Sequence, residues 1–237
     1  MKNRLLCIAM AAVFAVGMIS CGNPAGPEDF TLTTENVDNY IVSIGNYEGL
    51  SVEASKQEFT DDIVQYYADS YYDTLARETE GMLDEDGNPI PMTDAAIAML
   101  GSDVYSTVSE FMVFTRNTVE DYLQYSFEND VVEAAVKEIV ASSEFKDIPD
   151  ALLAYEEEII SEQFSDIAAS YELELDEYLK LCGSSMEALA TEYAKEELVF
   201  YKIAKDKDFE ITDESSLTDR VFEYLFEVTN VTEPIGE

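Results

Sequence analysis

Apolar side chains recur three and four residues apart over most of the chain beyond residue 60, the spacing that gathers them on one face of an α-helix. The longest such stretch has no glycine or proline between Gly101 and Pro149, so no residue in it interrupts a helix. Thr107 and Glu110 are spaced as a capping box at its start. The pattern predicts one continuous helix from about Val108 to Val140, roughly 50 Å long, which would serve as an arm or a spine.

Shorter helices are predicted on both sides of this long one. Thr60 and Thr93 each precede a helical pattern, and we expect their hydroxyl groups to cap it. After Pro149 the pattern predicts a helix with one apolar face, and the glutamate run Glu156–Glu158 is expected on its solvated face. The remaining predicted helices begin near Asp176, after a Ser184 cap and after a Thr212 cap.

These patterns predict a mainly α protein, an elongated multi-helix fold with little or no β structure. Only Tyr40–Ile44 alternates weakly, as a short strand or extended segment does. The predicted organisation is a signal peptide at 1–20, a flexible tether at 21–36, an extended segment with a tyrosine-rich helix at 37–92, a helical domain at 93–230 and a tail at 231–237.

The first twenty residues have the features of a secretory signal. Lys2 and Arg4 precede an apolar run that is too short to span a membrane, and Met18-Ile19-Ser20-Cys21 resembles a bacterial lipobox. The resemblance implies that Cys21 carries a lipid that holds the protein on the extracytoplasmic face of the cell membrane. The alternative is an ordinary secreted protein in which this cysteine is accidental.

Composition narrows the possible chemistry. The chain has 237 residues and a net charge of −38, and all 51 acidic residues follow Cys21, so nucleic acid is not an expected partner. The charge favours basic or cationic partners, and the alternative is a solvated surface without any specific ligand. Histidine is absent, which removes the commonest general base and zinc ligand, and Cys182 is the only cysteine after Cys21. We therefore predict no catalytic residue, cofactor or metal site.

One acidic turn has some of the features of a calcium-binding loop. Leu83–Pro89 carries three consecutive acidic residues, but its glycine comes too early for an EF-hand loop and no glutamate closes the loop. The residues therefore predict a turn there.

Five motifs resemble the trigger factor family of bacterial folding chaperones. Ile44–Val52 is similar to the family's LGxYKGLEV segment, with Glu48 in place of the lysine. The others occur in the order of the carboxy-terminal, substrate-cradling domain of that family: Asn129-Asp130-Val131-Val132, Asp147-Ile148-Pro149-Asp150-Ala151-Leu152, Leu175-Asp176-Glu177-Tyr178-Leu179 and Ile211-Thr212-Asp213-Glu214. The resemblance implies a helical chaperone scaffold, similar in role to SurA-type extracytoplasmic chaperones.

Two parts of the family pattern are missing from this sequence. The ribosome-docking glycine-phenylalanine-arginine run does not occur, so ribosome binding is not expected. Only about forty residues separate Val52 from Thr93, where the family carries a prolyl isomerase domain of the FKBP type, and these residues are too few for that domain.

The resemblance and the leader together predict a membrane-anchored holdase that binds unfolded or newly secreted polypeptides through apolar patches. Its candidate client-binding residues are Tyr66, Tyr72, Phe127, Phe164 and Tyr201, each of which could instead be ordinary core. The alternatives are an envelope lipoprotein that binds one specific partner and, less favoured by the chemistry, a peptidyl-prolyl isomerase.

Overall fold

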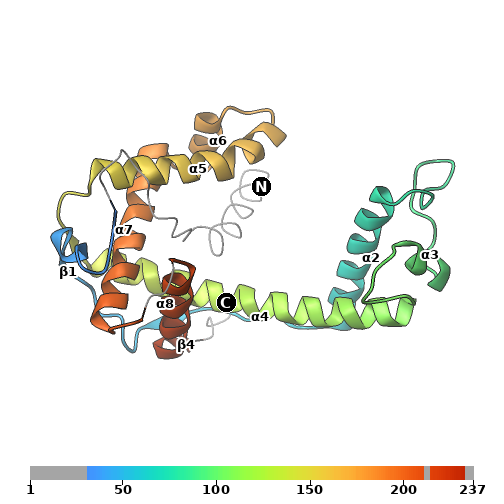
Figure 1. The fold of residues 1–237 in the computed structure, drawn as a ribbon, viewed down its shortest axis with the longest axis horizontal. Helices are drawn as coiled ribbons and strands as arrows, with labels where there is room; N and C mark the ends of the chain where they lie inside the picture. The colour runs from blue at the N-terminus through green and yellow to red at the C-terminus, as the bar shows by residue number, and fades with distance from the viewer. Residues whose placement is uncertain (1–30, 211–213, 233–237) are drawn as a thin grey trace, which may run out of the picture. The chain divides into compact units, whose positions relative to one another are not determined.

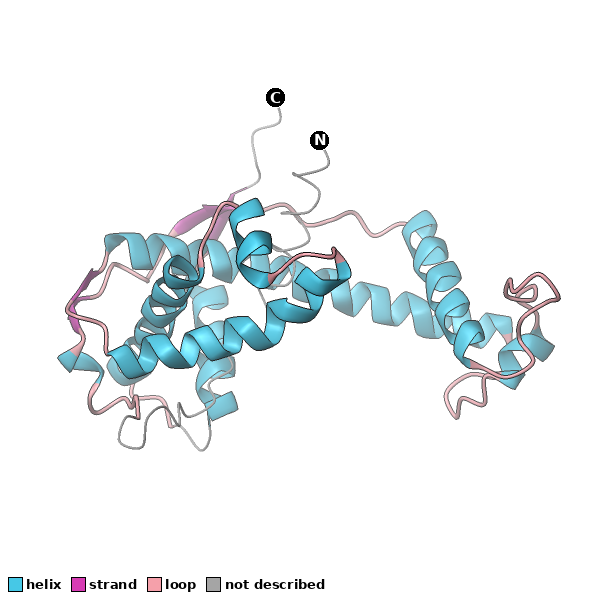
Figure 2. Cartoon of the chain, turned by 90° about the horizontal axis from the view of Figure 1, so that it is seen from above, coloured by secondary structure: helices cyan, strands magenta, loops and turns pink. Residues whose placement is uncertain are grey.

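The computed structural model describes residues 31–210 and 214–232 and is mainly α-helical, as predicted (Figures 1 and 2). Cys21, Thr212 and residues 233–237 lie outside the described residues. The helices are η1 (Val37–Asn39), α2 (Asp61–Glu78), α3 (Asp94–Met99), α4 (Val108–Ser142), α5 (Asp150–Ser170), α6 (Leu175–Leu181), α7 (Met186–Asp206) and α8 (Glu214–Val228). The strands are β1 (Ile41–Ser43), β2 (Ser51–Glu53), β3 (Glu144–Phe145) and β4 (Asn230–Thr232).

Local capping sets the start of several helices. The Thr60 hydroxyl accepts a hydrogen bond from the Ile63 amide at 3.3 Å, and Thr93 caps α3 in the same way. The Glu110 amide donates to the Thr107 hydroxyl at 3.2 Å, so the predicted start of the long helix is confirmed. These bonds satisfy amides that have no partner within the first helical turn.

One predicted cap is displaced by a residue. Ser185, and not Ser184, accepts the amide hydrogen bond at the start of α7. The Ser184 amide instead donates to the carbonyl of Leu179, where it helps to close the end of α6. Of the two adjacent serines, Ser184 therefore helps to end α6, and Ser185 caps α7.

The chain divides into two compact units. Unit 1 contains the described residues up to Ala54 and from Glu128 onward, and unit 2 runs from Ser55 to Phe127. The division does not follow the predicted boundary at residue 93, because α2 packs with α3 and with the first part of α4. The long helix α4 therefore contributes residues to both units.

Unit 1 contains two hydrophobic clusters. In the first core cluster, Val136 of α4, Leu152 of α5 and Leu198 of α7 pack with Leu225 of α8. In the second core cluster, the far part of α5 packs with α6 and with the start of α7. The buried members of the second cluster are Ile160, Phe164, Ala168, Tyr178, Leu179, Leu189, Ala190 and Tyr193.

Four short strands form two separate pairs in unit 1, so the expectation of little β structure is met. β1 pairs antiparallel with β3, and β2 pairs parallel with β4. The second pair corrects the predicted tail, because Val231 and Thr232 belong to β4. Its register joins Val52 to Val231, residues that are far apart in the sequence.

The segment before β1 is also corrected. The predicted tether extends to residue 36, but Leu32 is only 1% exposed and belongs to the first core cluster. Thr33 and Asn36 close a turn behind it through two backbone-to-side-chain hydrogen bonds. Within the described residues, the segment from Leu32 onward is therefore part of the folded body.

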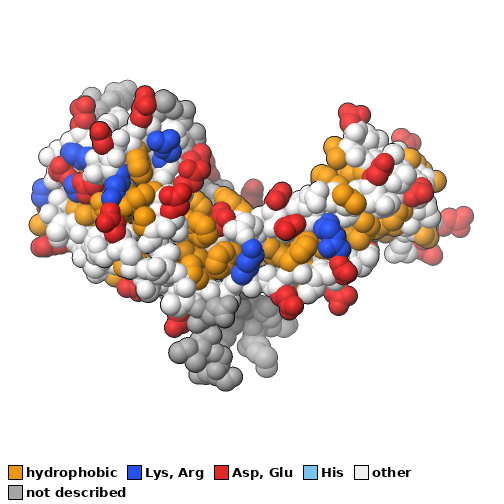
Figure 3. Space-filling view, turned by 90° about the horizontal axis from the view of Figure 1, so that it is seen from below, with side chains coloured by type: hydrophobic (Ala, Val, Ile, Leu, Met, Phe, Trp, Pro, Cys, Tyr) orange, Lys and Arg blue, Asp and Glu red, His pale blue; other side chains and the backbone are white. Residues whose placement is uncertain are grey.

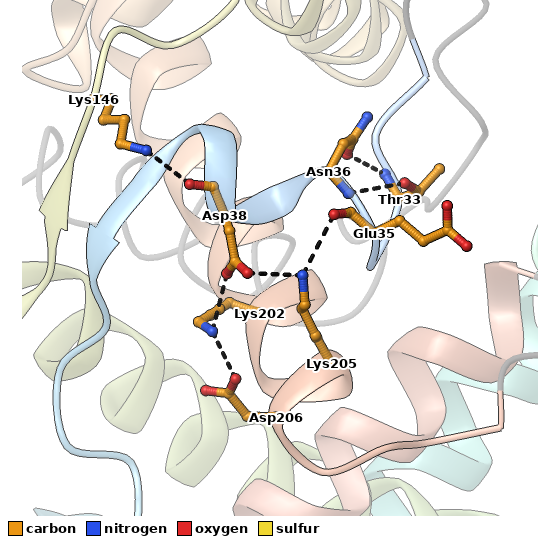
Figure 4. A network of polar contacts seen from close by, with 8 residues as sticks. All are labelled: Thr33, Glu35, Asn36, Asp38, Lys146, Lys202, Lys205 and Asp206. Carbon is orange, nitrogen blue, oxygen red and sulfur yellow. Dashed lines mark hydrogen bonds and ion pairs between the residues drawn. The ribbon is translucent and has the colours of Figure 1, made fainter.

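Ionic contacts hold this segment to α7 (Figure 4). The Asp38 carboxylate lies between Lys205 and Lys202, at 2.8 and 3.1 Å. These two lysines hold the pKa of Asp38 below its usual value, the Lys205 hydrogen bond contributing most. Lys146 donates to the Asp38 backbone carbonyl at 2.8 Å. The contacts are exposed, so we regard them as orienting the segment while Leu32 supplies most of the stability.

The structure explains why position 48 carries a glutamate in place of the family's lysine. Glu48 accepts hydrogen bonds from Lys207, which follows α7, and from the Tyr224 hydroxyl at 2.9 Å. The Lys207 ammonium also lies over the Tyr47 and Tyr224 rings, at 5.3 and 4.8 Å from their centroids. A lysine at position 48 would repel Lys207, so the negative charge at position 48 matches the positive charge of its partner.

Candidate functional site

Unit 2 carries a group of tyrosine side chains that are not enclosed by its core. Tyr66, Tyr67 and Tyr71 come from α2, and Tyr122 comes from α4; we call these four residues the tyrosine surface. Tyr66 is 70% exposed and Tyr122 is 51% exposed. Figure 3 shows hydrophobic side chains reaching the surface among acidic ones. Large exposed aromatic rings at this density are typical of an interaction surface.

Ring contacts join the tyrosine surface across the two helices. The Tyr66 and Tyr67 rings meet edge to face at 5.7 Å, and Tyr67 lies 6.0 Å from Tyr122. Tyr71 stacks on Phe111 at 5.9 Å, with an interplanar angle of 7°. Phe111 is fully buried, so the Tyr71 ring rests on an ordered aromatic core. The orientation of Tyr71 is therefore set before any ligand arrives.

The charges around this surface are mostly negative. The cations of residues 55–127 are Lys56, Arg77 and Arg116. Arg77 pairs with Asp73 at 2.8 Å, Arg116 pairs with Asp61, and Lys56 donates to the side chain of Gln124. Acidic residues outnumber these cations several-fold in the same stretch. The surface thus combines apolar rings with a net negative field.

The structure separates the five predicted client-binding residues. Tyr66 is exposed on the tyrosine surface, and Phe127, at the end of unit 2, is partly buried. Tyr72 is buried and donates its hydroxyl hydrogen bond to the Ile90 carbonyl at 2.9 Å. Phe164 and Tyr201 are buried in the second and the first core cluster. Three of the five are therefore core side chains in this structure, and client contact by any of the five stays a prediction.

Sequence reasoning missed Tyr122 and Tyr71 as surface residues. Both stand at apolar positions of a helical pattern, and such a pattern alone does not distinguish a face covered by another helix from one left open. Tyr122 occupies a regular apolar position of α4, yet half of its side chain is accessible. Only the packing of α2 against α4 reveals which part of each stripe is covered.

The described residues contain no set of three or more acidic or cysteine side chains arranged to hold a metal ion. In the turn before Pro89, the Asp84 carboxylate accepts the amides of Asp86 and Asn88, so it stabilises the turn itself. A pocket of about 410 Å³ is lined by Glu35, Lys205 and Phe209, but it is open and adjoins the contacts that hold the N-terminal segment.

None of the helices in the described part of the chain has both the length and the apolar composition required to cross a membrane.

Comparison with known proteins gives one family. Residues 107–225 match the family model described as bacterial trigger factor protein C-terminus. Trigger factors of Streptococcus agalactiae from a serotype V and a serotype III strain are each 26% identical to the chain over 152 residues. That alignment covers 60% of the chain and 36% of each relative, so the chain spans little more than a third of their length. No solved structure matches the chain significantly.

Proposed function

We infer a chaperone-like function for this chain, which belongs to the family of the bacterial trigger factor C-terminus. Its proposed ligands are unfolded segments of other polypeptides, which it holds and keeps from aggregating. The observation that carries the proposal is the tyrosine surface, which is partly open to solvent: ring contacts join three of its tyrosines, and the fourth, Tyr71, stacks on Phe111.

The chemistry of this surface suits a ligand without a fixed sequence. A tyrosine ring offers a large contact area and loses little conformational entropy on binding, because it has only two side-chain torsions. Several such rings give many weak contacts, which favours binding that is broad and reversible. The surrounding carboxylates keep the exposed rings soluble between binding events.

Aggregation of a chemically reduced client protein, followed by light scattering, tests this function. The full chain at an equimolar ratio should delay aggregation. Replacing both Tyr66 and Tyr122 by serine removes two accessible rings, and at about 0.7 kcal/mol for each contact the client affinity should fall roughly tenfold. Full-chain protein that leaves the aggregation curve unchanged would refute the proposed function.

A matched control distinguishes the tyrosine surface from exposed aromatic area in general. Tyr171 is 45% exposed and lies in unit 1, where it stacks on Tyr178. Tyr171→Ser should protect the client as well as the unmodified chain does. Equal losses in this variant and in the double variant would show that the tyrosine surface has no special role.

We further propose that the protein acts at the extracytoplasmic face of the cell membrane through a lipid on Cys21. The proposal rests on the lipobox-like Met18–Cys21 sequence, which lies outside the described residues. The burial of Leu32 leaves at most about ten residues between Cys21 and the folded body. Such a linker is short, so the body would stay within a few tens of ångströms of the lipid surface.

Metabolic labelling with a fatty-acid analogue tests the anchor. Label should appear in the unmodified chain and vanish in Cys21→Ala, and the variant should move from the membrane fraction to the soluble fraction. Cys182→Ala is the matched control, because Cys182 is the one other cysteine after the leader, and it should keep both the label and the membrane association. Unlabelled protein that stays in the membrane fraction would contradict lipidation at Cys21.

A further inference from the structure

Two glutamates lie inside the interface between α5 and α7. Glu156 follows Leu152 by four residues and precedes Ile160 by four, so all three share one face of α5. Leu152 belongs to the first core cluster and Ile160 to the second. Glu197 of α7 directly precedes Leu198 of the first cluster and follows Tyr193 of the second by four residues. The two carboxyl groups therefore occupy the layer between the two clusters of unit 1.

This placement corrects the prediction for the glutamate run. Glu157 and Glu158 are exposed, as expected, but Glu156 is only 3% exposed and Glu197 is 5% exposed. After burial, the charge of Glu197 is the next cause of the raised pKa of Glu156, so the two carboxyl groups lie close together in this layer. Two adjacent buried carboxylates repel each other, and a proton on one of them relieves the repulsion and supplies the hydrogen for a bond between the two groups.

The charged groups around the pair do not compensate two negative charges. The cation near this layer is Lys137 of α4, and it pairs with Glu133 of the same helix. Burial opposes the charge on Lys137, but Glu133 and the neighbouring carboxylates leave its pKa raised. The other titratable groups that face this layer are Glu192, Tyr193 and Glu196, all from α7.

Burial raises the pKa of Glu156 to about 10, and the charge of Glu197 contributes next. The pKa of the partly buried Glu196 rises to about 8, through burial first and then the charge of Glu192. Burial and the charge of Glu196 raise the pKa of the Tyr193 hydroxyl as well. All these shifts have one physical origin, which is the cost of placing negative charge in an apolar and already anionic layer.

We propose that Glu156 and Glu197 form a proton-dependent latch between α5 and α7. While the pair holds its proton, the two helices stay packed and the two core clusters remain joined. Breaking the O–H bond releases the proton to solvent and leaves two adjacent carboxylates inside the interface. Their repulsion and their need for hydration then separate α5 from α7 and expose the apolar faces of both clusters.

The sign of the pH dependence follows from the direction of the shift. In the unfolded chain the Glu156 carboxyl has its ordinary pKa of about 4.5, whereas in the folded chain it holds its proton to about pH 10. Stability from this group is therefore complete below the unfolded pKa and falls as the pH rises toward the folded pKa. Between these limits folding takes up about one proton at the pair, and Glu196 adds to the uptake below about pH 8.

Denaturant unfolding of the full chain between about pH 6 and pH 9 tests the latch. The free energy of unfolding should fall with pH at a slope that corresponds to roughly one or more protons released on unfolding. The double variant Glu156→Gln with Glu197→Gln keeps the shape of both side chains and should lose about one proton from that slope. The exposed Glu158→Gln is the matched control and should retain the full slope. A double variant that keeps the full slope overturns the proposal.

Infrared spectroscopy detects the latch proton directly. The unmodified chain at neutral pH should show the carbonyl band of a protonated carboxylic acid, which should disappear as the pH passes about 10. Glu196→Gln should retain such a band, because the latch proton does not belong to Glu196. If this variant has no such band at neutral pH, the pair carries no proton and the proposal is overturned.

Discussion

Replacing Phe164 by alanine should destabilise unit 1 by about 3–5 kcal/mol. Phe164 of α5 is fully buried in the second core cluster, where α5 packs with α6 and α7. Removal of its ring costs the hydrophobic transfer energy and leaves a cavity that the packed helices cannot close. A loss of this size approaches the whole stability of an ordinary domain, so much of the protein should be unfolded at physiological temperature.

Chemical denaturation followed by far-ultraviolet circular dichroism measures this loss. Phe164→Leu is the graded control, because it keeps most of the buried apolar volume and should lose well under half as much. Client protection should be normal wherever the Phe164→Ala variant remains folded. A variant of full stability with lost client protection would instead restore Phe164 as a client-binding residue, as the sequence had predicted.

Replacing Leu32 by alanine should lower the free energy of unfolding of unit 1 by about 2–4 kcal/mol. The side chain is 1% exposed and packs in the first core cluster together with Val37 and Ile41. If Leu32 lay in a flexible tether, the same substitution would leave the free energy of unfolding unchanged, because an unpacked leucine does not contribute to stability. The prediction therefore separates a folded N-terminal segment from a linker.

Thr31→Ala is the matched control for Leu32, because Thr31 is adjacent and its side chain is exposed. It should leave the denaturation midpoint unchanged. Limited proteolysis gives a second readout: cleavage before Val37 should be slow in the unmodified chain and fast in Leu32→Ala. A Leu32→Ala variant with the midpoint of the unmodified chain would show that residues before Val37 do not stabilise the body.

The helices could be predicted because their determinants are local. A threonine hydroxyl caps an amide three residues away, so Thr60, Thr93 and Thr107 could be identified from neighbouring residues alone. The absence of glycine and proline likewise predicted the continuity of α4. Such signals need no knowledge of the tertiary structure.

A short strand was predicted within Tyr40–Ile44, where β1 lies, but the pairing of β2 with β4 and the buried glutamates could not be predicted in this way. β2 and β4 pair across most of the chain, and each has only three residues, too few to show alternation. Glu156 stands in a run of three glutamates, and its neighbours are solvated. Only the position of α7 against α5 determines which of the three becomes buried.

The candidate site shows the same limit. The sequence predicted the tyrosine-rich helix, whose rings could belong to the core or to an interaction surface. In the structure, adjacent tyrosines of this helix take different roles. Tyr72 points into the core while Tyr71 remains 40% exposed above Phe111. The rings are chemically alike, so composition could not assign one role to each.

The parallel pairing of β2 with β4 has a consequence for the order in which the units form during translation. Unit 2 is one uninterrupted stretch and can fold as soon as Phe127 has emerged. Unit 1 must wait, because Gly49 and Leu50 bond to Asn230, which is made 181 residues after Gly49. Asn230 is also made 103 residues after Phe127, and at about 5–20 residues per second this interval is roughly 5–20 s. Throughout it, the nascent chain carries a complete unit 2 and an incomplete unit 1.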